Sequence, residues 1–307
     1  MKIDVKLDSA GLKLAGHLYI PDSADGPRAA IVVGHPGSGV KEQASGLYAR
    51  RLVERGFVTL AFDAAYQGES EGTPRGLEDP AHRVEDVKAA VSFLSTHAAV
   101  DPARIGALGI CASGGYVIAA AATDHRIKAV ATVSGVDIGR HFRDGADGTQ
   151  APAVVRTMLD AAAAARTAEA RGEGVGSFPL FPANKEQARA GGAYVFEGWD
   201  YYCTPRAQHP RSAKALTWNS VDRIASFDAF RFVDMIAPRP LLLILGTAAA
   251  TSWMGREAFI AAREPKEVIW IEGATHNDLY DRDQYVTPAV AKLEPFFTTN
   301  LSPVDKR

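Results

Sequence analysis

The sequence predicts a doubly wound α/β fold, in which a mostly parallel sheet is covered by helices on both faces. Three observations support this prediction. Short apolar runs alternate with helical patterns along the 307 residues, the first two runs read as a β-hairpin, and one late connection is very long. Short runs that are apolar on both faces are what a parallel sheet between two helical layers requires. An antiparallel start and a large insertion complete the predicted architecture.

The elements follow in chain order. A hairpin is expected at 2–8 and 12–20, with its turn at "SAG". The segment "KEQASGLYARRLVERG" ends on Gly56 as a capped helix does, and apolar residues recur at helical spacing over 84–94. The remaining strands are expected at "AAIVVG" (29–34), "VTLAF" (58–62), "IGALGI" (105–110), "IKAVATVS" (127–134), "LLLIL" (241–245) and "EVIWIE" (267–272).

The long connection predicts an inserted, mainly helical cap at 136–238, which leaves 1–135 and 239–307 as the core. A crossover rarely needs roughly a hundred residues, so the segment has the size of a domain. It opens with a long helical pattern at 151–171 and continues with many aromatic residues. There are two interpretations of these rings. They form the core of the cap, or some of them line a pocket above the carboxyl ends of the strands. The candidates for the pocket are Tyr66, Trp199, Tyr201 and Tyr202.

Composition excludes several classes of function. A formal net charge of −2 shows no basic field for nucleic acid or an anionic membrane. The chain has no apolar export segment and no run of 18 apolar residues, so we expect a soluble cytoplasmic protein. The two cysteines, Cys111 and Cys203, are too few for a disulfide scaffold or a thiolate metal site. We therefore expect no metal and no cofactor, a small-molecule substrate as the partner, and a homodimer as an open alternative.

The stretch "LGICASGGY" (108–116) has the pattern of a nucleophile elbow, a sharp strand-to-helix turn between small residues. The small neighbours are Gly109 and Ser113 if the turn is centred on Cys111, and Cys111 and Gly115 if it is centred on Ser113. The apolar run ends just before Cys111, which favours the cysteine as the nucleophile. The helix dipole is expected to lower the pKa of its thiol from about 8.5. The alternative is a buried, inert cysteine.

His276 is the histidine best placed to act as the base, because it follows the last expected strand in "VIWIEGATHNDLY". The loop "GHPGSG" (34–39) follows another strand, and its backbone N–H groups near Gly37 and Ser38 can join that of Ala112 as an oxyanion hole. The plainer interpretation of this loop is a flexible turn.

These motifs together resemble the α/β-hydrolase superfamily. The resemblance extends from about residue 4 to Asn300 and includes "FDAAYQGESEG", "VATVSGVD" and "GATHNDLYD". Within the superfamily, the chain is similar to the dienelactone-hydrolase-like group, whose elbow is G-x-C-x-x-G-G with a cysteine nucleophile, and which includes fungal polyketide acyltransferases. The resemblance implies an α/β-hydrolase fold, a nucleophilic Cys111 and a basic His276.

One position departs from the pattern of these relatives. They usually carry the catalytic acid just after the strand "PLLLILG", where this chain has alanine at 248, 249 and 250. Asp137, which follows another strand, is the first candidate to replace that acid. Asp278 and a Cys–His dyad without an acid remain alternatives. Asp137 also has the plain interpretation of a helix N-cap.

Three functions are compatible with these residues. The first is hydrolysis of an ester, lactone or thioester through a cysteinyl acyl-enzyme. The second is transfer of a polyketide-like acyl group to a small-molecule acceptor. The third is ligand binding without catalysis on a hydrolase scaffold, which the missing acid makes credible. Fold alone does not decide among them.

Overall fold

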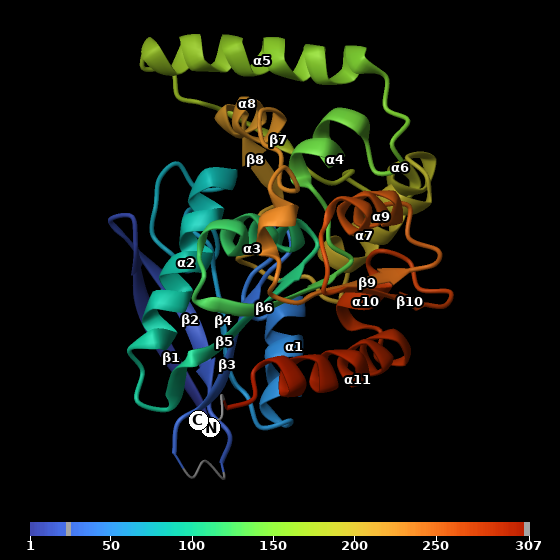
Figure 1. Ribbon diagram of the computed structural model, residues 1–307. Coiled ribbons are helices and arrows are strands. Elements are labelled where there is room, and N and C mark those ends of the chain that lie inside the picture. Colours follow the sequence, from blue (N-terminus) through green and yellow to red (C-terminus); the bar gives the residue numbers. More distant parts are fainter. Residues whose placement is uncertain (23–25, 304–307) are drawn as a thin grey trace.

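The computed structural model describes residues 1–22 and 26–303, which build an eight-stranded sheet in the order β1-β2-β4-β3-β5-β6-β9-β10 (Figure 1). Strand β2 pairs antiparallel with β1 and β4, and all the other neighbours are parallel. The strands are β1 Lys2–Ser9, β2 Leu12–Tyr19, β3 Arg28–Gly34, β4 Val58–Phe62, β5 Val100–Ile110, β6 Ile127–Val133, β9 Leu241–Gly246 and β10 Lys266–Ile271. The predicted α/β fold is confirmed, including the hairpin at its start.

Helices cover both faces of the sheet, and each face has its own apolar core. On one face, residues of α2, α3 and α9 pack against the sheet; on the other, residues of α1, α10 and α11 do so. The bounds are α1 Ala44–Val53, α2 Pro80–Ser95, α3 Ala112–Thr123, α9 Ser252–Ala261, α10 Asp278–Asp281 and α11 Asp283–Asn300. The central strands β3, β5 and β6 are buried on both sides, which is why they appear in the sequence as continuous apolar runs.

Residues 136–238, for which the sequence predicts a cap, lie between β6 and β9 and are hereafter called the cap segment. Its elements are α4 Ile138–Asp144, α5 Pro152–Ala170, β7 Ser177–Pro179, α6 Lys185–Ala190, α7 Ala193–Cys203, β8 Ala215–Thr217, η1 Trp218–Ser220, α8 Val221–Ala225 and η2 Val233–Ile236. Helix α5 lies at the top of Figure 1, and Ala162 is its one buried residue. Among the residues that the structure describes, no helix has both the length and the apolarity needed to cross a membrane.

Candidate active site

Cys111 lies at the turn between the last residue of β5, Ile110, and the first residue of α3, Ala112. Its backbone has φ 56° and ψ −120°, a conformation that costs a non-glycine residue about 1–3 kcal/mol. The turn is tight enough that a Cβ on Gly109 would lie 2.1 Å from the carbonyl oxygen of Ser113, so this position requires glycine. The strand-to-helix elbow predicted from the sequence therefore exists and is centred on Cys111.

Ser113 points away from the cavity that Cys111 lines. Its hydroxyl donates a hydrogen bond to the carbonyl oxygen of His35 (2.5 Å) and accepts one from the guanidinium of Arg83 (3.1 Å). The side chain is buried, and only Cys111 of the two candidates contributes to the cavity wall. Ser113 thus ties helix α3 to the loop after β3.

The thiol of Cys111 lies beside two backbone N–H groups, those of Ala112 and Gly37, and beside the hydroxyl of Tyr280, all of which act on its pKa. The structure therefore brings together two of the three N–H donors predicted for an oxyanion hole. Ser38 lines the same cavity with φ 61°, and its carbonyl oxygen accepts hydrogen bonds from the cap segment.

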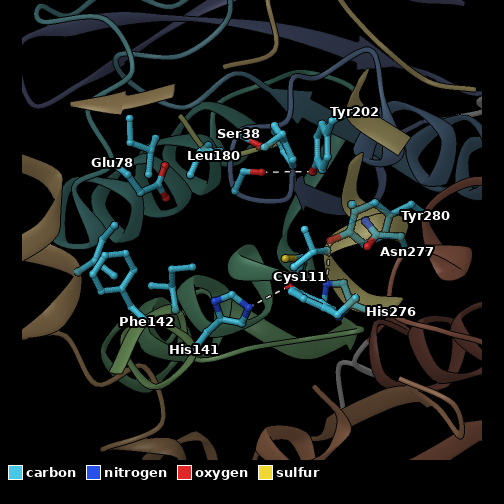
Figure 2. Close-up of a pocket in the computed structure, with 18 residues that line it drawn as sticks. Ser38, Glu78, Cys111, His141, Phe142, Leu180, Tyr202, His276, Asn277 and Tyr280 are labelled. Carbon is cyan, nitrogen blue, oxygen red and sulfur yellow. Dashed lines mark hydrogen bonds between the residues drawn. The ribbon is translucent and has the colours of Figure 1, made fainter. Parts of the chain in front are cut away.

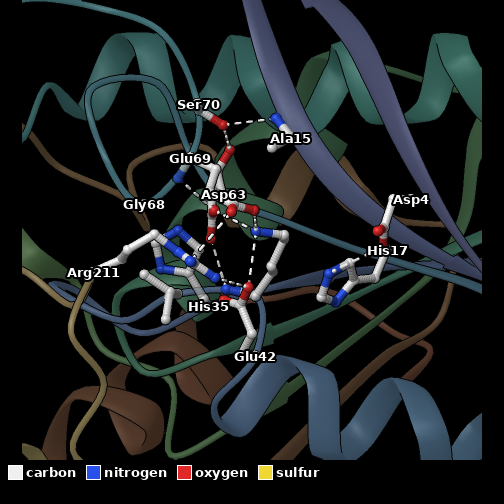
Figure 3. A network of polar contacts seen from close by, with 12 residues as sticks. Asp4, Ala15, His17, His35, Glu42, Asp63, Gly68, Glu69, Ser70 and Arg211 are labelled. Carbon is white, nitrogen blue, oxygen red and sulfur yellow. Dashed lines mark hydrogen bonds and ion pairs between the residues drawn. The ribbon is translucent and has the colours of Figure 1, made fainter.

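An ion cluster around the buried side chains of Lys41 and Asp63 holds the loop that carries Gly37 and Ser38. Lys41, whose side chain is 2% exposed, contacts Asp63 at 2.9 Å, Glu69 at 2.6 Å and Glu42 at 3.0 Å (Figure 3). Arg211 of the cap segment contacts Glu42 and Glu69 in turn. Every charge in this cluster has an opposite partner, so the cluster fixes the loop and joins it to the cap segment.

Burial raises the pKa of the Cys111 thiol, although the hydrogen bonds from Tyr280, Ala112 and Gly37 favour the thiolate. This corrects the expectation of a lowered pKa. A helix N-terminus stabilises a negative charge, but removing the sulfur from water disfavours that charge more strongly here. The resting side chain is a neutral thiol.

His276 is 1% exposed and lies at the carboxyl end of the sheet, as predicted. Its Nε2 atom is 2.9 Å from the hydroxyl of Tyr280, and its Nδ1 atom is 2.6 Å from the hydroxyl of Thr251. Burial and then the nearby His141 lower its pKa to about 3, so the imidazole is neutral. The hydroxyl of Tyr280 lies beside Cys111 and bonds His276 (Figure 2). His276 in turn bonds Thr251, so the groups follow one another in the order Cys111, Tyr280, His276 and Thr251.

Asp137 does not hold His276. One carboxylate oxygen accepts the backbone N–H groups of Gly139 (2.8 Å) and Arg140 (3.2 Å), and the other accepts that of Ala229 (2.9 Å). Asp137 is thus the N-cap of α4, the plain interpretation of the sequence pattern, and the three hydrogen bonds that it accepts all come from backbone N–H groups. Asp278 instead accepts the backbone N–H of Thr275.

Thr251 lies after the strand at whose end the similar hydrolases usually carry the catalytic acid. It follows the three alanines directly and forms the N-cap of α9. A neutral imidazole that donates from Nδ1 to the hydroxyl of Thr251 keeps Nε2 free to accept a proton. A hydroxyl therefore orients His276 here, without the charge that a carboxylate would add.

Asp137→Asn is expected to lower the free energy of unfolding by about 1–3 kcal/mol, while turnover stays within about threefold of the wild type. The asparagine oxygen still caps α4, but its amide nitrogen cannot accept the backbone N–H of Ala229. Thr251→Val, which removes the partner of Nδ1 on His276, is expected to lower turnover much more. Thermal melts and initial rates for both variants check this. A larger loss of rate in Asp137→Asn than in Thr251→Val would restore Asp137 as the acid.

The sulfur of Cys111 opens into a cavity of about 270 Å³ between the core and the cap segment. Most of its wall is apolar, and Figure 2 shows Tyr280 and His276 beside Cys111 and Glu78 on the opposite side. The residues that line it include Glu78, His141, Phe142, Phe181, Tyr194 and Tyr202. Among the residues that the structure describes, no group of His, Cys, Asp and Glu side chains has an arrangement that could hold a metal ion.

Of the four aromatic residues predicted for the pocket, Tyr202 lines the cavity, and its hydroxyl donates to the carbonyl oxygen of Gly37. The other three lie elsewhere. Tyr66 packs its ring against His82, Trp199 stacks on Phe196, and Tyr201 is buried against Tyr202 and Tyr280. These three rings stabilise the packing, which corrects the expectation.

Five residues of the site were not predicted from the sequence: Tyr280, Thr251, His141, Tyr194 and Glu78. A signal existed for Tyr280, which lies four residues after His276 in "HNDLY", a spacing that places two side chains on one side of a helical turn. The others come from segments far apart in the chain and carry no local pattern.

Comparisons with known proteins agree with this fold and show its family. The dienelactone hydrolase family matches residues 14–165. The uncharacterized protein YcjY of Escherichia coli is 40% identical over 293 residues, which cover 94% of this chain and 95% of YcjY. The crystal structure of the hypothetical protein PA2218 from Pseudomonas aeruginosa superposes with a TM-score of 0.91 at 36% identity, covering 98% of this chain and 94% of that one.

A more distant relative has a name that states an activity. The acyltransferase drtE of Aspergillus calidoustus is 24% identical over 279 residues, covering 88% of this chain and 87% of drtE. With the elbow, the sheet order and the full-length similarity to YcjY, these matches show that the chain belongs to the dienelactone hydrolase family of α/β hydrolases.

Proposed function

We propose that this protein cleaves a small ester, lactone or thioester through a cysteinyl acyl-enzyme on Cys111. One observation carries the proposal: the sulfur at the strained elbow lies among the N–H groups of Gly37 and Ala112 and one hydroxyl away from a neutral histidine. A nucleophile, an oxyanion site and a base thus meet in one cavity.

The chemistry follows from the hydrogen bonds. As the sulfur attacks the carbonyl carbon, the thiol proton passes to the oxygen of Tyr280, whose own proton passes to Nε2 of His276. The N–H groups of Gly37 and Ala112 stabilise the oxyanion. When the bond to the leaving group breaks, the proton returns through Tyr280 to the departing oxygen or sulfur. Water then attacks the thioester on Cys111, and the thiol is regenerated.

The cavity indicates a small, uncharged acyl group. Its volume of about 270 Å³ lies just below the range of roughly 300–1,000 Å³ that is usual for small-molecule sites. Its wall is mainly apolar, so acyl groups with a short aliphatic or aromatic chain fit better than charged ones.

Acyl transfer is a second candidate. The apolar wall around Cys111 disfavours bulk water near the thioester, and the relative drtE is named an acyltransferase. The second half of the reaction then uses an acceptor other than water, and the first half is unchanged.

The test is intact mass spectrometry of the protein after mixing with short-chain nitrophenyl esters and acyl thioesters, followed by peptide mapping. The expected result is one acyl group on Cys111 that disappears on standing. Binding of these compounds without an adduct or turnover on any of them would support the non-catalytic alternative instead.

Phe181→Ala is expected to change the preference between acetyl and larger acyl groups by roughly 1–3 kcal/mol, because it removes a ring from the cavity wall. Trp199→Ala is the matched control, an aromatic residue of the cap segment outside the cavity, and is expected to change only thermal stability. Values of kcat/KM on a series of nitrophenyl esters check both. Equal preferences in Phe181→Ala and the wild type would contradict the pocket assignment.

The pH dependence of kcat/KM is expected to have no acid limb near 6.5, the usual pKa of histidine. His276 must be neutral to accept a proton, and its pKa of about 3 keeps it neutral throughout the range of pH 5–8. The folded state also loses stability as pH falls from about 6.5 towards 3, because protonation favours the unfolded chain, so rates are measured within seconds of a pH jump. A limb centred near 6.5 would show that water reaches His276.

A further inference from the structure

A second tyrosine–histidine pair lies in the same cavity. His141 on α4 and Tyr194 on α7 belong to the cap segment, and Nε2 of His141 is 2.8 Å from the hydroxyl of Tyr194. Both side chains line the cavity, and Figure 2 shows the imidazole of His141 turned towards Cys111. The proton path from Cys111 through Tyr280 to His276 does not use this pair.

The pair lies directly beside the first one. The ring of Tyr194 meets the ring of His276 edge to face, with 5.6 Å between their centroids. Burial lowers the pKa of His141 to about 4 and raises that of Tyr194, to which the nearby Cys111 also contributes. A neutral phenol therefore faces a neutral imidazole, which is the arrangement that Tyr280 and His276 also have.

The fold holds His141 in place. Asp137 caps the N-terminus of α4 and also accepts the backbone N–H of Ala229. The carboxylate that was expected to hold His276 therefore fixes the helix that carries His141. Because α4 and α7 come from distant parts of the cap segment, His141 and Tyr194 meet only in the folded chain.

We propose that Tyr194 and His141 activate the acceptor in the second half of the reaction, and that this acceptor is a neutral alcohol. This inference rests on the proposed acyl-enzyme on Cys111. It assigns Tyr280 and His276 to acylation, and Tyr194 and His141 to deacylation.

The lining of the cavity identifies the class of acceptor. None of the described residues that line it is Lys or Arg, so a carboxylate or phosphate on the acceptor has no partner there. Its one carboxyl side chain, Glu78, accepts a hydrogen bond from the hydroxyl of Tyr116 at 2.7 Å and lies 3.6 Å from Arg83. A neutral hydroxyl group on an apolar body suits such a wall.

The step balances as follows. The acceptor oxygen attacks the thioester carbonyl, its proton passes to the oxygen of Tyr194, and the phenol proton of Tyr194 passes to Nε2 of His141. The carbon–sulfur bond then breaks. The sulfur leaves as a thiolate, takes a proton from the imidazolium of His141 through Tyr194, and becomes the thiol again. An ester and free enzyme result, with no change in oxidation state.

The experiment separates the two halves of the reaction. The probes are 4-nitrophenyl acetate and butyrate, with ethanol or trifluoroethanol as the acceptor. The burst of nitrophenolate measures acylation, the decay of the acyl adduct by intact mass measures deacylation, and chromatography measures the ester formed. The variants are Tyr194→Phe, which keeps the ring, and His141→Gln. His125→Gln, which removes an exposed histidine, is the control.

For Tyr194→Phe and His141→Gln, we expect a burst rate within about threefold of the wild type and a decay of the adduct in ethanol slowed about a hundredfold or more, the usual contribution of a general base. Trifluoroethanol, which is more acidic, should recover part of the loss, an effect that a packing defect would not produce.

Decay at the wild-type rate in both variants would overturn the proposal. Equal losses in burst and decay would also overturn it, because the pair would then serve the structure of the site. If the wild type forms no adduct on Cys111, the proposed function itself fails, and this inference fails with it.

Discussion

Cys111→Ala is expected to lower kcat/KM on short-chain nitrophenyl esters by at least about 10³-fold, because it removes the atom that forms the acyl-enzyme. The variant should fold normally, since alanine fills the same turn with a smaller side chain and Cys111 donates its backbone N–H to Val133 as before. Steady-state rates and thermal melts measure the two effects.

Ser113→Ala is the matched control from the same elbow. Its hydroxyl bonds His35 and Arg83 outside the cavity, so its loss should cost about 1 kcal/mol of stability and little rate. An acyl group mapped to Ser113, with Cys111 unmodified, would contradict the assignment of the nucleophile.

Tyr280→Phe is expected to slow acylation by about 10²–10⁴-fold, the usual range for a proton-transfer group. The hydroxyl lies beside the sulfur of Cys111 and bonds Nε2 of His276, and phenylalanine cannot pass a proton between them. The ring itself packs edge to face against Tyr201, with centroids 5.0 Å apart, and this packing is kept. The rate of the nitrophenolate burst measures acylation.

Tyr201→Phe is the control for this variant. It removes a hydroxyl from the same aromatic cluster, and that hydroxyl bonds the backbone of Ala44 rather than the cavity. Its burst rate should stay within about twofold of the wild type. A wild-type burst rate in Tyr280→Phe would mean that Cys111 passes its proton to His276 directly, and the path through Tyr280 would be abandoned.

Sequence patterns predicted the sheet and the elbow because both depend on neighbours in the chain. An apolar run between helices indicates a buried strand. The end of such a run beside small residues locates the turn, and β5 does end at Ile110. His276 was predicted on the same ground, since a loop after the last parallel strand returns to the carboxyl edge of the sheet.

Predicting which residues line the pocket requires knowing which face of α7 meets the cavity, and the sequence does not contain this information. Tyr194, Gly198 and Tyr202 lie four residues apart on α7 and all line the cavity, whereas Trp199 and Tyr201 lie on other sides of that helix. Helical spacing shows which residues share a face. The docking of α7 against the core decides which face meets the cavity.

The sequence by itself thus determined the order of strands and helices, the elbow at Cys111 and the end of the sheet at which His276 lies, because these follow from local periodicity and turn chemistry. Only the tertiary structure decided the hydrogen-bond partners of His276. Asp137 and Thr251 both follow strands that end at the same edge, but Asp137 is held by the backbone of its own helix and of Ala229, 92 residues away. Thr251 reaches Nδ1 across a 25-residue separation. A buried polar group bonds whichever partner the packing brings within reach, and that distance exists only in the folded chain.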